Sequence, residues 1–322
     1  MAYSEAVLTR AKARLAQARE QRDQENQRRI AAIYRAHPRL REIDRQLRTT
    51  AAQIMRAAFT QGGDPALAVE EVRRHNQALQ QEWDRILASE GIGVAELRAE
   101  PVCTACGGTG YVGAWMCECL RELCRQEQKK ELSSLLGGRE SFETFRLDYY
   151  SDAPDPHTGI SPRTVMQKVL RKCRKYAEQF SASSPSLLFS GGTGLGKTFL
   201  SAAIARAAAD RGFSAVYDMA GKVFSDFEAE KFGGAANLTV KYLKCDLMIL
   251  DDLGTEMTTQ FTLSALYSLV NSRLIAGLPT IISTNLTTQE LQQRYTPQIA
   301  SRLLGAYELV LFVGSDIRLR DK

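Results

Sequence analysis

The sequence is constrained most strongly by one short stretch just past its middle. Residues 191–198 read Gly-Gly-Thr-Gly-Leu-Gly-Lys-Thr, which matches the G-x-x-x-x-G-K-[ST] phosphate loop. Residues 186–190 are typical of a short buried strand, and an alanine-rich stretch that ends at Gly212 predicts a helix. Because this loop holds phosphate between a strand and a helix N-terminus, the order predicts an α/β domain that binds a nucleotide.

The residue types of the loop predict individual contacts with ATP and Mg²⁺. Lys197 is expected to bridge the β- and γ-phosphates, and the hydroxyl of Thr198 is expected to ligate Mg²⁺. Backbone N–H groups that point inward surround the β-phosphate in such loops. The residues assigned to this cradle are Gly191, Gly192, Thr193, Gly194, Leu195 and Gly196.

Polar residues also end the next two apolar runs. The first run ends in Asp251 and Asp252, and the second ends at Asn285. A carboxylate at a strand tip can hold the Mg²⁺ water shell, and a second carboxylate can orient or deprotonate an attacking water. We therefore assign Asp251 to Mg²⁺ and Asp252 to the water, and we expect the Asn285 amide to position that water or to sense the γ-phosphate.

A cysteine motif lies upstream of the phosphate loop. Cys103 and Cys106 form a C-x-x-C, and after a glycine-rich loop Cys117 and Cys119 form a C-x-C. Four thiolates at this spacing suit a tetrahedral Zn²⁺, which would fold a segment too short to have its own core. The second pair could instead be Cys119 and Cys124, and reduced thiols or an iron–sulfur cluster are alternative interpretations.

Long helices are expected at the N-terminus. Residues 3–59 contain no glycine and one proline, Pro38, so two helices should meet there, and a third should follow Asp64. Residues 1–56 carry 13 Lys and Arg against 6 Asp and Glu. A solvated helical face explains this charge, with a nucleic-acid site as the alternative. Without any catalytic constellation, this region is expected to bind a partner.

These patterns divide the 322 residues into four segments. They are an all-α partner-binding domain (1–100), a zinc module (101–124), a linker helix and loop (125–162) and the ATPase domain (163–322). No apolar run approaches the ~20 residues of a membrane-spanning helix. The N-terminus also lacks the apolar core of an export signal. We therefore expect a cytoplasmic protein without membrane contact.

The motifs together resemble the AAA+ ATPases, and among them the replicative helicase loaders of the DnaC/DnaI type, which are related to IstB. The resemblance covers about residues 140–322 and rests on Phe142-Glu-Thr-Phe145, GGTGLGKTFLSAAIA from Gly191, LMILDDLG from Leu247, ISTN ending at Asn285, and ASRLLG from Ala300. It implies a parallel sheet between helices. Only nine residues follow the last expected strand, 308–313, so no C-terminal helical lid is expected.

The resemblance also implies roles and partners. Arg302 would be an arginine finger that reaches the γ-phosphate of a neighbouring subunit, and Arg318 would be a second arginine; a surface salt bridge is the alternative for each. The implied function is ATP-dependent loading of the replicative hexameric DNA helicase onto single-stranded DNA, with self-association through the ATPase domain. Most AAA+ proteins have Glu where Asp252 stands, and the shorter side chain can slow hydrolysis.

Two other functions are compatible with a phosphate loop. One is a transposition helper ATPase of the IstB type, whose core this chain also resembles. The other is a small-molecule P-loop kinase, but Asp252, Asn285 and Arg302 suit attack by water better than phosphoryl transfer to a small acceptor. The cysteine motif and the helical N-terminal region favour the loader.

Overall fold

The computed structural model describes residues 3–49, 65–136, 140–156, 158–234 and 236–319. The chain separates into two compact units. One unit comprises Arg14–Cys117, and the other comprises Met1–Ala13 together with Glu118–Lys322. No helix in the described ranges is both long enough and apolar enough to cross a membrane.

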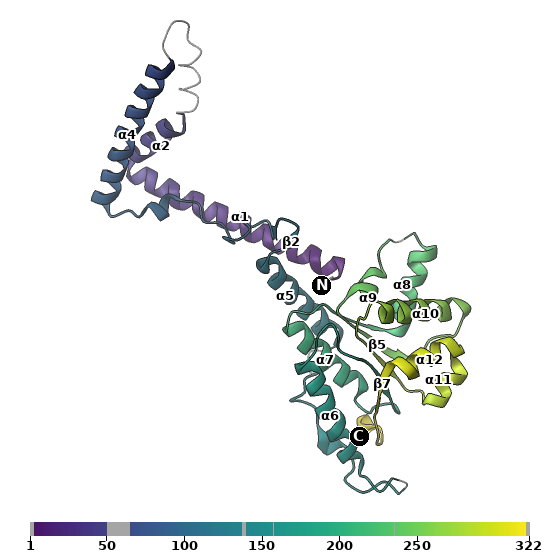
Figure 1. Cartoon of the computed structure of the whole chain (residues 1–322). Helices are drawn as coiled ribbons and strands as arrows, with labels where there is room; N and C mark the ends of the chain where they lie inside the picture. Colours follow the sequence, from purple (N-terminus) through teal and green to yellow (C-terminus); the bar gives the residue numbers. More distant parts are fainter. Residues whose placement is uncertain (1–2, 50–64, 137–139, 157, 235, 320–322) are drawn as a thin grey trace. The chain divides into compact units, whose positions relative to one another are not determined.

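The unit Arg14–Cys117 is built mainly from helices. It contains most of α1 (Glu5–Ala36), then α2 (Pro38–Arg48), α4 (Pro65–Glu90) and the short η1 (Val94–Leu97). Proline at the first position of α2 confirms the predicted junction. α2 and α4 lie side by side (Figure 1), and Leu40 and Ile43 of α2 are fully buried.

Part of the basic charge of α1 serves the structure of this unit. The guanidinium of Arg29 donates hydrogen bonds to the carbonyl oxygens of Glu96 and Arg98, at 3.0 and 2.7 Å. The side-chain amide of Asn26 donates to the carbonyl of Glu100 at 2.9 Å. These contacts tie residues 96–100 to α1 and satisfy backbone groups that no helix or sheet pairs.

The other unit contains a parallel five-stranded sheet in the order β4-β5-β6-β3-β7. The strands are β3 (Ser186–Ser190), β4 (Ala215–Met219), β5 (Leu247–Leu253), β6 (Thr280–Thr284) and β7 (Tyr307–Leu311). Because every pair is parallel, all carboxyl ends meet at one edge. The predicted α/β fold is confirmed. The phosphate loop follows β3 at this edge, and both predicted acids lie near the carboxyl end of β5, which extends past them to Leu253.

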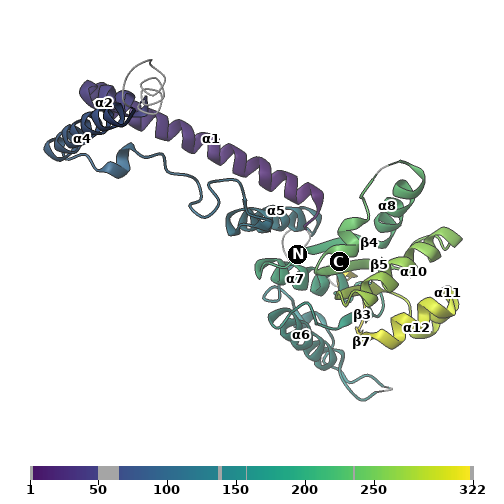
Figure 2. The ribbon, with the colours of Figure 1, turned by 45° about the horizontal axis from the view of Figure 1, so that its top comes forward.

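Helices cover both faces of the sheet (Figures 1 and 2), and each face has its own hydrophobic core. One face carries α5 (Glu118–Leu136), α6 (Pro162–Glu178) and α7 (Lys197–Asp210). The opposite face carries α8 (Ala220–Phe232), α9 (Val240–Lys244), α10 (Gln260–Ile275), α11 (Thr288–Arg294) and α12 (Pro297–Ala306). After β7 the described residues form one short turn, η3 (Ile317–Leu319).

The segment expected to be a linker belongs to the unit that contains the five-stranded sheet. Tyr150 is 1% exposed, and its hydroxyl donates to the carbonyl of Leu195 at 3.0 Å. Phe145 stacks on Tyr150 with ring centroids 5.9 Å apart. A Cβ added to Gly196, which has φ +83°, would lie 2.9 Å from Phe145. The predicted linker, 125–162, therefore includes aromatic residues that pack on the phosphate loop. Burial of these rings is favourable in free energy, so the segment packs although its other residues are largely polar.

Candidate nucleotide-binding site

The carboxyl edge of the sheet holds a cavity of about 400 Å³. It brings together many of the residues predicted from the sequence. They include Thr193, Gly194, Leu195, Gly196, Lys197 and Thr198 of the phosphate loop, together with Asp252, Asn285 and Arg318. Glu140, Phe199 and Ile317 complete the lining and had no assigned role in the sequence. Gly191, Gly192, Asp251 and Arg302 do not line this cavity.

The phosphate loop has the backbone that its glycines predict. Gly194 has φ +66°, a conformation that L side chains rarely adopt. A Cβ at Gly194 would also lie 1.7 Å from a carboxylate oxygen of Asp316. A side chain at position 194 would therefore be strained, and the close approach of Asp316 shows that the C-terminal segment lies against the loop.

Lys197 lies between the phosphate loop and the end of β6. Its Nζ donates hydrogen bonds to the carbonyl oxygens of Gly191 at 2.7 Å and Gly192 at 2.6 Å, and to Oδ1 of Asn285 at 2.7 Å. Burial lowers the pKa of Lys197, while the carboxylates of Asp252 and Asp251 oppose that shift. A cation fixed at this position suits the neutralisation of phosphate charge.

Asp251 is surrounded by hydroxyl groups. The Thr198 hydroxyl donates to Oδ2 of Asp251 at 2.9 Å, and the phenol of Tyr217 donates to the same oxygen. The hydroxyl of Ser283 donates to Oδ1. Asp251 is only 2% exposed, and these three donors offset the free-energy cost of burying its polar side chain. The Thr198 and Asp251 oxygens form the hard donor set that Mg²⁺ prefers.

Asp252 has a different environment from its neighbour. Its backbone has φ +54°, and its N–H donates to the hydroxyl of Ser283 at 3.0 Å. Partial burial and the charge of Asp251 raise the pKa of Asp252, while Lys197 and Arg318 act in the opposite direction. Its carboxyl group lines the cavity. This placement suits a group that accepts a proton from a water beside bound phosphate.

The two arginines differ in their contacts. Arg318 lines the cavity and forms an ion pair with Asp316 at 3.0 Å. Arg302 lies on α12, where its Nε donates to Oδ1 of Asn271 and its Nη2 to the hydroxyl of Tyr267, each at 3.0 Å. Its guanidinium lies over the Tyr267 ring, 4.6 Å from the centroid. No acidic residue in the described ranges pairs with Arg302, so the salt-bridge alternative has no support there.

Comparison with known families adds to this geometry. Residues 161–322, half of the chain, match the family model described as IstB-like ATP binding protein. The chain belongs to this family of IstB-like ATP-binding proteins. The matched half contains the phosphate loop, both acids, Asn285 and both arginines.

This IstB-like chain also has curated relatives among replicative helicase loaders. The Replicative helicase loader DnaC of Escherichia coli (strain K12) is 26% identical over 156 residues, which cover 47% of this chain and 63% of the relative. DnaC of Buchnera aphidicola subsp. Schizaphis graminum is 24% identical over 168 residues, 51% of this chain and 62% of the relative. The alignments thus span less than two thirds of these relatives.

Solved structures give more distant likenesses. The crystal structure of the DnaC helicase loader has a TM-score of 0.46 and 19% identity, covering 54% of this chain and 97% of that one. The crystal structure of DnaI has a TM-score of 0.42 and 22% identity, covering 46% of this chain and 85% of that one.

The IstB-like chain also brings four cysteines together. One sulfur from each of Cys103, Cys106, Cys117 and Cys119 lies within 4.8 Å of the others. The sulfurs of Cys103 and Cys117 are 3.8 Å apart. Bonds of ~2.3 Å to a tetrahedral Zn²⁺ place sulfurs roughly 3.8 Å apart. The donor set and its spacing therefore fit zinc.

Local structure supports this set of cysteines over the alternative. The segment folds into a hairpin of β1 (Tyr111–Val112) and β2 (Trp115–Met116), and the N–H of Gly110 points at the sulfur of Cys106 at 3.3 Å. Cys124 is outside the cluster. Burial raises the pKa of Cys124 to about 11, which favours a neutral thiol. The pair that the structure assembles with Cys103 and Cys106 is Cys117 and Cys119.

Sequence reasoning missed Ser283 and Tyr217. Ser283 contacts both acids, and Tyr217 contacts Asp251. Each lies on a strand next to β5 in the sheet, β6 and β4 respectively. The available signal was a serine directly after the apolar pair of β6, a strand in which Ser283 proves to be fully buried. The partners of Ser283 depend on the order of the strands, which the sequence does not reveal.

Proposed function

We propose that the chain hydrolyses ATP with Mg²⁺ at this cavity. The observation that carries the proposal is the hydrogen bond of 2.9 Å between Thr198 and Asp251. It joins the phosphate loop to the acid that follows the apolar part of β5. Lys197, Asp252 and Asn285 line the adjoining cavity, so all the groups needed for attack by water are within one site.

Each of these side chains has a distinct task in the proposed reaction. Lys197 binds the phosphate oxygens and offsets their charge. Thr198 and Asp251 would hold Mg²⁺, which when bound supplies further positive charge beside the phosphates. Asp252 takes the proton from the attacking water, and the Asn285 amide orients that water. Arg318 lines the same cavity and can contribute a further positive charge to it.

We also propose that Arg302 acts on the nucleotide of a neighbouring subunit. It does not line its own cavity, and its guanidinium is held by neutral partners at the surface of α12. A mixture of two variants tests this. A Lys197→Ala subunit lacks its own site but can donate Arg302, and an Arg302→Ala subunit keeps a complete phosphate loop. Each variant alone should be inactive, and the mixture should regain ATPase activity. If subunit exchange is demonstrated and the mixture still has no ATPase activity, the shared site is contradicted.

The cellular role we propose is the loading of the replicative hexameric helicase onto single-stranded DNA, in the cytoplasm. The curated relatives carry the name of replicative helicase loaders. In this account the N-terminal segment, 1–100, binds the helicase, and the ATPase segment, 163–322, self-associates and contacts DNA. ATP and ADP states would differ in affinity for these partners, as a switch requires.

We further propose that the cysteine cluster binds one Zn²⁺. The sulfur positions fit tetrahedral coordination, and the hairpin of residues 111–116 is too small to be held by apolar burial alone. The metal would hold the segment 101–124 together.

Co-purification of the tagged chain from its own host tests the cellular role. Capture of the replicative helicase, dependent on the N-terminal segment, is the expected result. The match to the IstB-like family favours a second candidate, a transposition helper, which would capture a transposase instead. Phosphate release to water without any small-molecule acceptor would separate both from a kinase.

A further inference from the structure

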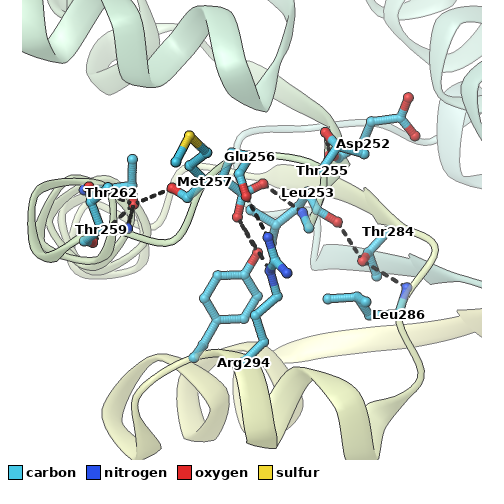
Figure 3. Close-up of polar contacts among 12 residues, drawn as sticks. Asp252, Leu253, Thr255, Glu256, Met257, Thr259, Thr262, Thr284, Leu286 and Arg294 are labelled. Carbon is cyan, nitrogen blue, oxygen red and sulfur yellow. Dashed lines mark hydrogen bonds and ion pairs between the residues drawn. The ribbon is translucent and has the colours of Figure 1, made fainter.

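The segment after Asp252 is fastened to β6 at its start (Figure 3). The hydroxyl of Thr284 donates to the carbonyl of Leu253 at 2.6 Å. The hydroxyl of Thr255 donates to the carbonyl of Asp252 at 2.8 Å, and the Asp252 N–H is bound by Ser283. The backbone that carries Asp252 is therefore fixed on both sides of its α-carbon.

The far end of the same segment is fastened to α11 through Glu256 (Figure 3). The Glu256 side chain is 5% exposed. Its Oε2 accepts from the N–H of Gly254 at 2.7 Å, and its Oε1 accepts from the phenol of Tyr295 at 2.5 Å. Arg294, the last residue of α11, donates to the carbonyl of Glu256, and its Nε is 4.0 Å from Oε1. Four contacts thus converge on one buried acidic residue.

The same helix pair carries Arg302. Tyr295 and Thr296 connect α11 to α12, and Arg302 lies in the middle of α12. Tyr295 is buried in the same core as Ile299 and Leu303 of α12. A displacement of Tyr295 would therefore be transmitted to α12, because side chains in a close-packed core cannot move independently.

Glu256 makes the connection stiff. A buried acidic oxygen without a partner is costly, so separating the loop from α11 would leave Oε1 of Glu256 without the Tyr295 hydroxyl, while Oε2 keeps the N–H of Gly254. Movement of the Asp252 loop and movement of the α11–α12 pair are consequently linked. Such linkage is reciprocal: whatever shifts one end biases the other.

We infer that Glu256 and Tyr295 are positioning residues that couple Asp252, in a subunit's own site, to Arg302, which that subunit offers to its neighbour. The inference rests on the proposed role of Arg302 in trans. It gives a role to the buried polar side chain that ties the loop after the second acid to α11. Through this connection, occupancy of one site would alter the next site around an assembly.

The mixture of Lys197→Ala and Arg302→Ala subunits tests the coupling. Tyr295→Phe keeps the buried ring and removes the hydroxyl, which donates to Glu256 and also interacts with Arg294. In the Lys197→Ala subunit, which donates Arg302, this change should disturb the position of Arg302. In the Arg302→Ala subunit, which accepts the arginine and holds the intact site, it should disturb the position of Asp252. We expect regained activity to fall about 5-fold or more in each arrangement, the lower range of couplings between sites.

A matched change provides the control. The phenol of Tyr176, on α6 and the opposite face of the sheet, donates to the carbonyl of Pro185 at 2.8 Å. Tyr176→Phe also removes one hydroxyl and one hydrogen bond, and it should leave both arrangements unchanged. Equal effects of the two variants, or a loss in the acceptor alone, would overturn the coupling. Failure of the parent mixture to regain activity would instead overturn the shared site.

Hydrogen exchange of the single variant gives a test that needs no assembly. In Tyr295→Phe, amides of residues 252–257 and of α12 should both exchange faster than in the parent chain. In Tyr176→Phe neither segment should change. Faster exchange in the loop while α12 keeps its parent rate would contradict a connection between the two.

Discussion

The hydroxyl of Thr198 donates a hydrogen bond of 2.9 Å to Oδ2 of Asp251. Thr198 lies at the start of α7, which follows β3, and Asp251 lies in β5. In the sheet, β6 separates these two strands. Ser283 of that intervening strand contacts both Asp251 and Asp252. The bond between Thr198 and Asp251 therefore closes a connection across three strands, and it orders the groups that would bind Mg²⁺ and water.

Lys197→Ala should weaken nucleotide binding strongly. The change removes the ammonium that offsets phosphate charge, and hydrogen bonds to charged groups contribute enough that affinity should fall by about 10-fold or more. Equilibrium binding of a fluorescent ATP analogue measures this. Lys168→Ala, an exposed lysine on α6, is the control and should bind normally. Unchanged affinity in Lys197→Ala would place the phosphates elsewhere.

Asp252→Asn should separate binding from hydrolysis. The amide keeps the size of the side chain and leaves Thr198 and Asp251 intact, but it cannot take a proton from water. Turnover should fall by ~10²-fold or more, as for a lost general base. Steady-state hydrolysis and ATP affinity, measured on the same sample, test the assignment. A loss of affinity as large as the loss of turnover would give Asp252 a role in holding nucleotide or metal instead.

Ser283→Ala should impair the site through the two acids it contacts. The change leaves the Asp252 N–H and one oxygen of Asp251 without their partner, at a cost of about 1–3 kcal/mol in the free energy of unfolding. Turnover should fall as well, because Asp252 loses its fixed backbone position.

A matched serine separates these two effects. Ser186 is the first residue of β3, at the end of the strand away from the site, and its hydroxyl accepts from the N–H of Thr280 at 3.0 Å. Ser186→Ala should lower stability in urea denaturation by a similar amount and keep its turnover. Equal turnover in the two variants would mean that Ser283 acts only on stability.

The cysteine cluster should hold about one Zn²⁺ per chain. The double variant Cys103→Ser with Cys106→Ser should lose the metal and unfold residues 101–117, while nucleotide binding persists in the separately packed ATPase core. Elemental analysis after thiol-protected purification measures the metal. Cys124→Ser should retain zinc, since Cys124 is outside the cluster. Zinc that depends on Cys124 would overturn this ligand assignment.

The phosphate loop and both acids could be predicted because their chemistry requires particular residue types at fixed places. The loop needs glycine at position 194 for a backbone with φ +66°, and Lys197 and Thr198 must begin the helix that follows. Asp251 comes directly after four apolar residues. These relationships are local in the chain, so sequence alone exposes them.

The features that sequence missed depend on contacts between distant segments. The contacts of Ser283 and Tyr217 follow from strand order, which no local pattern reveals. The packing of Phe145 and Tyr150 on the phosphate loop was hidden because those aromatic residues stand in a polar, proline-containing stretch typical of a linker. Which second cysteine pair joins the cluster depended on where α5 begins and on the burial of Cys124.

We propose that ATP at this site drives helicase loading, and a loading assay is the decisive test of this proposal. Replicative helicase from the same host would be incubated with circular single-stranded DNA, the chain and ATP, and the helicase retained on DNA would be quantified. We expect retention that requires the chain and ATP, and that is lost with Lys197→Ala. Retention that is equal with and without the chain, or equal for Lys197→Ala and the parent chain, would contradict it.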